Sequence, residues 1–141
     1  GLVGAALDRP EHTVELIADG EHVHPAPARV AWRPVGRDRL CLVSDAVDLG
    51  GDDGHATRLG DGTLAGARMG LDAAVRNVVS WGVPLADALL MASATPAGVA
   101  GRAALGTLDA GTPADLVLLD EDLTVAATLV GGVPVFERVA A

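Results

Sequence analysis

The carboxylate of Asp45 follows an uninterrupted apolar run and is the first candidate for chemistry in this sequence. The run Leu40–Val43 is typical of a strand buried on both faces, as in a parallel sheet or barrel. In such folds the carboxyl ends of the strands carry the active site, so Asp45 is a candidate general base, general acid or metal ligand. An aspartate here also suits a residue that only ends the strand and caps the next turn, and that alternative stays open.

A second polar cluster follows another predicted strand, which covers residues 13–18. Asp19–Gly20 is a strong turn signal that ends this strand, and Glu21 and His22 come directly after it. The segment between the two strands, with a short helical or irregular connection over residues 27–35, suits a βαβ unit. Because both carboxyl ends then lie at one edge, we expect His22 and Asp45 to border the same pocket.

The composition of the chain limits the number of domains and the classes of partner that it can have. The 141 residues are 50% hydrophobic, enough for one domain with a core that must be mainly aliphatic. A net charge of −9 argues against nucleic acid as a partner, because phosphate binding needs a basic surface. The single cysteine, Cys41, lies in the apolar strand and is expected to be buried and inert. No apolar run suits a membrane span or signal peptide, which predicts a cytoplasmic protein without a membrane partner.

The rest of the chain is predicted to supply scaffold. Apolar residues spaced as on one helix face predict a helix from Leu71 to Val79, then a second with Pro84 in its first turn. Thr95–Pro96 is predicted to break the second helix and to start a short third one through Val99. The Gly- and Asp-rich stretch over residues 47–62, which includes His55, is predicted to be a mobile loop. From Ala114 onward the pattern indicates strands, with a hairpin around Gly131–Gly132, and Gly106–Leu108 is grouped with them.

Several short motifs in one order resemble the last third of the N-acetylglucosamine-6-phosphate deacetylases, a family of amidohydrolases. The resemblance covers nearly all of the chain, and the joint order of the motifs makes it more specific than any one of them. The motifs are Asp19–Pro25, Leu42–Ala46, Asp61–Gly66, Ala74–Asn77, Trp81–Leu85, Met91–Ala97 and Ala114–Val117.

The resemblance implies an α/β fold in which this chain is the C-terminal part of a (β/α)8 amidohydrolase barrel plus part of a small β-sandwich. Residues 1–104 would supply barrel strands 7 and 8 with the helices after them, and residues 105–141 the sandwich segment. Asp45 would be the catalytic acid/base, acting on a metal-bound water that attacks the acetamide carbonyl. The substrate contacts would come from Asp19, Gly20, Glu21, His22, Leu64, Ala65 and Gly66.

The resemblance also implies a divalent metal, zinc or iron, in the complete enzyme. The family's ligands, a glutamate and two histidines, would lie before Gly1, so no metal ligand is expected in this chain and the fragment alone is predicted to be inactive. His22 and His24 form an H-x-H pair of the kind that binds metal in amidohydrolases. Alternate residues of an extended chain point to opposite faces, which favours a surface role for His24, although a metal role for the pair stays open.

Three hypotheses follow from the sequence. In the first, the full-length protein converts N-acetylglucosamine-6-phosphate to glucosamine-6-phosphate and acetate. In the second, the chain is a non-catalytic remnant or assembly module, stable as a homo-oligomer such as a dimer or by pairing with a missing N-terminal part. In the third, the amidohydrolase chemistry is kept but the substrate is another amide. The stretch over residues 47–60 is shorter than in typical members, which puts the geometry near Leu64–Gly66 in question.

Overall fold

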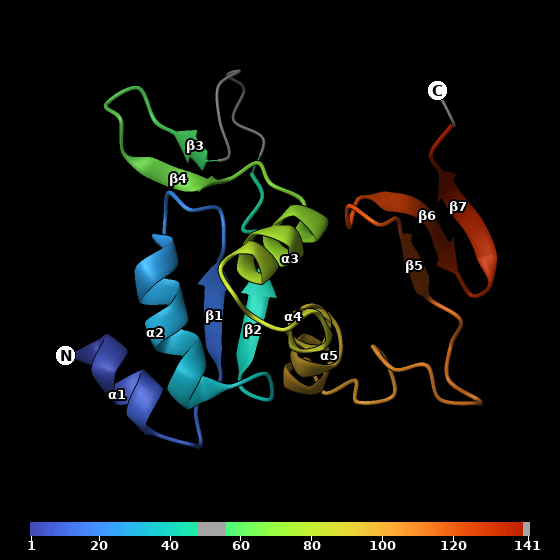
Figure 1. Ribbon diagram of the computed structural model, residues 1–141, viewed down its shortest axis with the longest axis horizontal. Helices are drawn as coiled ribbons and strands as arrows, with labels where there is room; N and C mark the ends of the chain where they lie inside the picture. Colours follow the sequence, from blue (N-terminus) through green and yellow to red (C-terminus); the bar gives the residue numbers. More distant parts are fainter. Residues whose placement is uncertain (48–55, 140–141) are drawn as a thin grey trace.

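The protein is described by a computed structural model that covers residues 1–47 and 56–139. The chain forms helices and strands in an α/β arrangement, as the sequence predicts, with sheet β5–β7 apart from the other elements (Figure 1). Within the described residues no helix is long and apolar enough to cross a membrane. The helices are α1 (Leu2–Asp8), α2 (Pro25–Val35), α3 (Leu71–Ser80), α4 (Leu85–Ala92) and α5 (Ala94–Val99); the strands are β1 (Val14–Ile17), β2 (Leu40–Val43), β3 (Ala56–Arg58), β4 (Leu64–Ala67), β5 (Leu116–Leu119), β6 (Val125–Val130) and β7 (Val133–Glu137).

The predicted βαβ unit is confirmed. Strands β1 and β2 pair in parallel, from Val14 opposite Leu40 to Ile17 opposite Val43, and α2 connects them. Pro25 starts α2, where its fixed φ suits the first turn, and Gly36 ends the helix with a φ of 68°. Both strands point their carboxyl ends toward the hairpin of β3 and β4 (Figure 1). The residues that follow β1 and β2 therefore share one edge of the unit.

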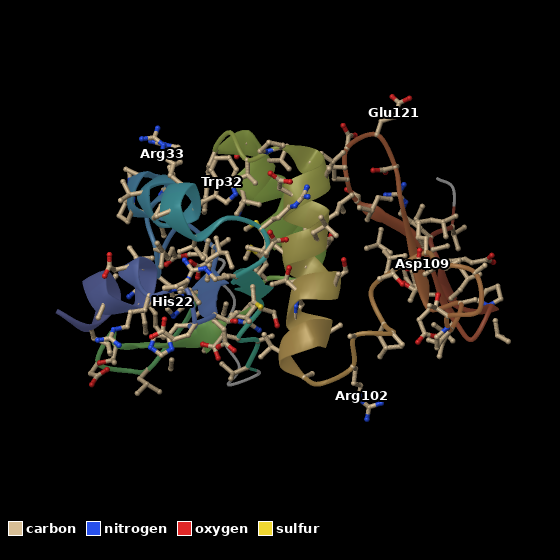
Figure 2. All side chains as sticks on the ribbon, turned by 90° about the horizontal axis from the view of Figure 1, so that it is seen from below. His22, Trp32, Arg33, Arg102, Asp109 and Glu121 are labelled. Carbon is tan, nitrogen blue, oxygen red and sulfur yellow. The ribbon has the colours of Figure 1, made fainter. Side chains whose placement is uncertain are left out.

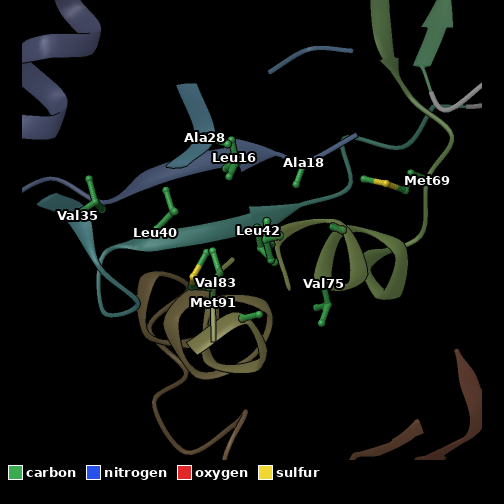
Figure 3. Close-up of a cluster of buried hydrophobic side chains, with 13 residues drawn as sticks. Leu16, Ala18, Ala28, Val35, Leu40, Leu42, Met69, Val75, Val83 and Met91 are labelled. Carbon is green, nitrogen blue, oxygen red and sulfur yellow. The ribbon is translucent and has the colours of Figure 1, made fainter. Parts of the chain in front are cut away.

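The core lies between the parallel strands and the helices that cover them. Leu40, Leu42, Val78 and Met91 are its largest fully buried side chains, and α3 and α4 pack against β2 (Figure 3). The helix pattern predicted over 71–79 is confirmed, and its apolar stripe is the face that carries buried Ala74, Val75 and Val78. The core therefore fixes the carboxyl end of β2, directly before Asp45.

Truncating this core should destabilise the fold. Leu42 is 2% exposed, and Leu42→Ala is expected to lower the free energy of unfolding by about 2–5 kcal/mol, through lost apolar burial and the cavity left behind. Leu108→Ala is the matched control, because Leu108 is 87% exposed. Chemical denaturation of both variants measures the difference, and equal stability of the two would contradict the packing described.

Two details of the sequence-based prediction are wrong. The stretch over residues 47–62 is not a loop throughout, because β3 forms at Ala56–Arg58 and pairs antiparallel with β4; residues 48–55, including His55, lie outside the described part. The third short helix predicted through Val99 is confirmed as α5, although the break before it falls at Ser93, whose φ of −134° and ψ of −85° are not helical, and not at Thr95–Pro96. Gly106–Leu108 forms no strand. Each error falls where the short local pattern was Gly-, Pro- or Asp-rich.

The strands predicted at the carboxyl end form one antiparallel sheet in the order β5-β6-β7. Gly131 and Gly132 both have positive φ and make the predicted turn between β6 and β7. Several apolar side chains of this sheet are exposed, among them Val117 at 58%, Val135 at 61% and Phe136 at 49%. The turn before β6 touches the rest of the chain: Arg76 of α3 donates to the Leu123 carbonyl at 2.7 Å, and the Leu123 side chain packs against the core.

Candidate active site

The turn after β1 is built around the buried carboxylate of Asp19. Its Oδ1 accepts hydrogen bonds from the backbone N–H groups of Glu21 at 2.9 Å and His22 at 2.8 Å. Its Oδ2 lies 2.6 Å from Nδ1 of the His22 ring. The side chain of Asp19 is fully buried and that of His22 is 15% exposed. One carboxylate thus fixes both the turn and the ring of His22, the histidine that the sequence selected and that Figure 2 labels.

Asp19 is ionised well into the acid range. Burial alone would raise the pKa of its carboxyl, but the hydrogen bonds from the His22 side chain and from the backbone of His22 and Glu21 together outweigh burial. The pKa therefore lies below its ordinary value of 3.8. An ionised carboxylate only accepts hydrogen bonds, so each atom facing Asp19 here is a donor.

The lowered pKa of Asp19 gives stability a definite pH dependence. A carboxyl whose pKa is lower in the folded than in the unfolded state adds stability that is fully present above the unfolded pKa. That contribution is lost as the pH falls through the folded pKa. The unfolding free-energy difference between wild type and Asp19→Asn should therefore narrow below about pH 4.

Urea unfolding of both proteins at pH 7 and at pH 3 measures this dependence. Asp38→Asn controls for the loss of one negative charge, because the Asp38 side chain is 90% exposed. A difference between wild type and Asp19→Asn that stayed constant over this range would contradict the assignment.

Asp45 follows β2 in a strained conformation. Its φ is 46°, a region that residues other than glycine rarely adopt, although Asp and Asn tolerate it better than most. Such outliers cluster at functional sites, where neighbouring structure holds them in place. The neighbouring structure here is β4: Ala67 N–H donates to the Asp45 carbonyl at 2.8 Å, and Val47 N–H donates to the Ala67 carbonyl at 2.9 Å. The residue is exposed at the strand edge.

The segment Leu64–Gly66, predicted to contact substrate, forms the first three residues of β4 and lies beside Asp45. Gly66 has a φ of 107°, and a Cβ built on it would come within 2.8 Å of the Asp45 carbonyl oxygen. Only a residue without a side chain allows the two backbones to approach this closely. The structure thus brings Asp45 and the Leu64–Gly66 segment together.

Glu21, also predicted to contact substrate, joins the β1 turn to the hairpin. Its carboxylate accepts from the Arg58 guanidinium at 3.0 Å and from the Ala56 N–H at 3.3 Å. Sequence reasoning did not select Arg58, and no local pattern pointed to its partner 37 residues away. Asn77 of α3 belongs to one of the motifs but was not selected as a site residue; its side chain donates to the Ala18 carbonyl at 2.8 Å and so holds the end of β1. Both contacts position the site from distant parts of the chain.

The two histidines of the H-x-H triplet have different roles. His22 is paired with Asp19, whereas Nδ1 of His24 accepts a hydrogen bond from the Ala26 N–H at 3.3 Å and caps α2. Across residues 1–47 and 56–139, no three or more His, Cys, Asp or Glu side chains are grouped so that they could hold a metal ion. The residues described here therefore do not fit a metal site, and we derive no chemical step through one from this chain.

The parallel strands β1 and β2, with polar residues after both, place the chain in the α/β class, and comparison with known proteins gives the family. The amidohydrolase family pattern matches residues 7–135, and the chain belongs to the amidohydrolase family. This family is generally metal-dependent. The chain is similar to a solved N-acetylglucosamine-6-phosphate deacetylase from Thermotoga maritima with a TM-score of 0.90 and 31% identity, over 98% of this chain and 42% of that one.

Curated relatives are named as deacetylases of two N-acetylated amino-sugar phosphates. The chain is 40% identical to N-acetylglucosamine-6-phosphate deacetylase from Vibrio furnissii, over 97% of this chain and 38% of that protein. A relative from Escherichia coli K12, whose name refers to N-acetylgalactosamine-6-phosphate deacetylase, is 38% identical over 94% of this chain and 88% of its own length. The chain thus spans 38% of the Vibrio relative but most of the Escherichia coli K12 one.

Proposed function

We propose that the complete protein containing these residues hydrolyses the acetamide of N-acetylglucosamine-6-phosphate to glucosamine-6-phosphate and acetate. The observation that carries the proposal is the position of Asp45, exposed after β2 and bonded through its backbone to β4. His22 lies after the neighbouring parallel strand β1. The names of the Vibrio and Thermotoga relatives supply the substrate.

In this proposal Asp45 moves the proton of the reaction. Its carboxylate takes a proton from the water that attacks the acetamide carbonyl carbon, and later delivers it to the amine nitrogen as the carbon–nitrogen bond breaks. One water is consumed, and acetate and the free amine are released. Gly20 and the Leu64–Gly66 segment are proposed to let the backbone approach the sugar phosphate closely. Asp19, Glu21 and His22 complete the proposed substrate side of the site.

The architecture of the complete protein follows the same proposal. Residues 1–104 would contribute strands 7 and 8 of a (β/α)8 barrel and the helices after them, and residues 105–141 would contribute to a β-sandwich. A divalent metal, zinc or iron, would be held by residues outside this chain. We further propose a cytoplasmic homodimer.

A substrate comparison on the purified complete protein tests the activity. N-acetylglucosamine-6-phosphate, N-acetylgalactosamine-6-phosphate and a β-aspartyl dipeptide are offered, and acetate or free amine is measured. We expect the highest kcat/KM for the first. Preference for the galactosamine isomer, which the name of the Escherichia coli K12 relative makes the nearest alternative, would change the substrate but not the reaction. Hydrolysis of the dipeptide alone would overturn the proposal.

A second function, that of a non-catalytic assembly module, is favoured by two observations. Apolar side chains are exposed on α1 and on sheet β5–β7, including Leu2 at 88% and Val133 at 63%. The Escherichia coli K12 relative is itself short, since this chain covers 88% of it. Exposed apolar surface and free strand edges favour association with another chain. Light scattering on the 141-residue chain decides: a monodisperse, cooperatively folding monomer would count against this function.

A further inference from the structure

The side-chain contacts of Asp19 point to a further role for its carboxylate, beyond its proposed place on the substrate side of the site. Both of its oxygens are engaged inside the protein: Oδ1 with two backbone N–H groups and Oδ2 with the His22 ring. The side chain is fully buried. A buried carboxylate surrounded by three donors has no oxygen directed to solvent, so Asp19 acts through the groups that it holds.

The group held most closely is the His22 imidazole. Because an ionised carboxylate only accepts hydrogen bonds, Nδ1 of His22 must carry a proton to make the 2.6 Å contact. In the neutral ring the second nitrogen, Nε2, then has a lone pair and no proton. The ring is 15% exposed, which leaves part of it accessible from solvent. The carboxylate thus decides which ring nitrogen is a hydrogen-bond acceptor.

Three hydrogen bonds hold the backbone that carries this pair. The Asn77 side chain holds the carbonyl of Ala18, the residue directly before Asp19, at 2.8 Å. The two backbone bonds to Oδ1 fix the turn that carries the ring. The carboxylate of Asp19 and the ring of His22 are three residues apart on one turn, and these hydrogen bonds hold the backbone of that turn.

We propose that Asp19 is a positioning residue that holds His22 in the Nδ1–H tautomer, so that Nε2 accepts a hydrogen bond from a donor group of the substrate, a hydroxyl or the acetamide N–H. This inference rests on the proposed function for the identity of the substrate, but the state of the ring does not. An enzyme that uses a histidine in one tautomer needs a partner on the other nitrogen, and Asp19 supplies it.

The variant Asp19→Asn separates this role from a purely structural one. An asparagine has nearly the same shape, and its carbonyl oxygen can still accept from the backbone of Glu21 and His22. Its amide nitrogen would then face Nδ1 of His22 as a donor, which requires the ring to accept there and to carry its proton on Nε2. The substitution therefore reverses the tautomer while keeping the turn.

Nitrogen NMR of histidine-labelled complete protein, at a pH high enough for neutral rings, reads the tautomer directly. We expect Nδ1–H for His22 in wild type and Nε2–H in Asp19→Asn. Glu21→Gln is the matched control, because it makes the same carboxylate-to-amide change two residues away and should leave the tautomer unchanged. A wild-type ring protonated on Nε2 would overturn the proposal, and this spectrum needs no variant to fold.

Steady-state kinetics of Asp19→Asn test whether the tautomer of His22 affects substrate binding. With Nε2–H facing a donor of the substrate, KM of Asp19→Asn should rise about tenfold or more, while kcat changes less. A reversed tautomer with unchanged KM would overturn the contact between Nε2 and substrate. If the wild-type protein hydrolysed no acetylated sugar phosphate, the proposed function would fail, yet the NMR result would still decide whether Asp19 sets the tautomer.

Discussion

Replacing Asp45 by asparagine in the complete protein is expected to lower kcat for acetamide hydrolysis by about 10²- to 10⁴-fold, the usual contribution of a general acid or base. Asparagine is the sharpest substitution because it tolerates the φ of 46° that this position requires. It keeps the shape of the side chain and removes its capacity to take and return a proton. The loss should therefore appear in kcat with little change in thermal stability.

Asp38→Asn is the matched control for this experiment. Asp38 precedes β2 and Asp45 follows it, so the same change is made at opposite ends of one strand. We expect wild-type kcat for Asp38→Asn. Full activity of Asp45→Asn would show that Asp45 only ends the strand, the alternative that its sequence position also allows. Equal losses in both variants would point to the strand rather than to the carboxylate.

The predictions that held are those with a local physical cause. An unbroken apolar run favours burial on both faces, so Leu40–Val43 was identifiable as an interior strand, and the chain between it and β1 predicted their parallel pairing. The helix at Leu71–Ser80 was identifiable because its apolar residues recur with helical spacing. The parallel pairing of β1 and β2 is enough to bring the residues after both strands to one edge of the unit.

The contacts that build the site were not predictable in this way. The Asp19–His22 pair spans three residues, but sequence alone gave no sign that the carboxylate would be buried and turned toward the ring. The Glu21–Arg58 pair depends on β3, whose three residues are too few to show a strand pattern. Side-chain partners across a fold depend on how elements pack, and periodicity describes only one element at a time.

Gly66→Ala tests the other half of the site, the close approach of β4 to Asp45. A Cβ at Gly66 would lie 2.5 Å from Val47 Cγ2 and 2.8 Å from the Asp45 carbonyl oxygen. The valine can rotate, but the oxygen cannot move without loss of its 2.8 Å hydrogen bond from Ala67. The φ of 107° adds strain of about 1–3 kcal/mol for any residue with a side chain. We expect both lower thermal stability and a displaced Asp45, with kcat/KM reduced at least about tenfold.

Gly62→Ala distinguishes the clash from the backbone strain. Gly62 lies in the same hairpin with a φ of 85°, but an added Cβ there meets nothing within 4 Å. Both variants should lose stability because an alanine disfavours positive φ, and only Gly66→Ala should also lose activity, because only that clash is transmitted to Asp45. Thermal unfolding and steady-state kinetics on both proteins measure the two effects separately. Equal activity losses would mean that the hairpin as a whole, and not its contact with the Asp45 backbone, supports the reaction.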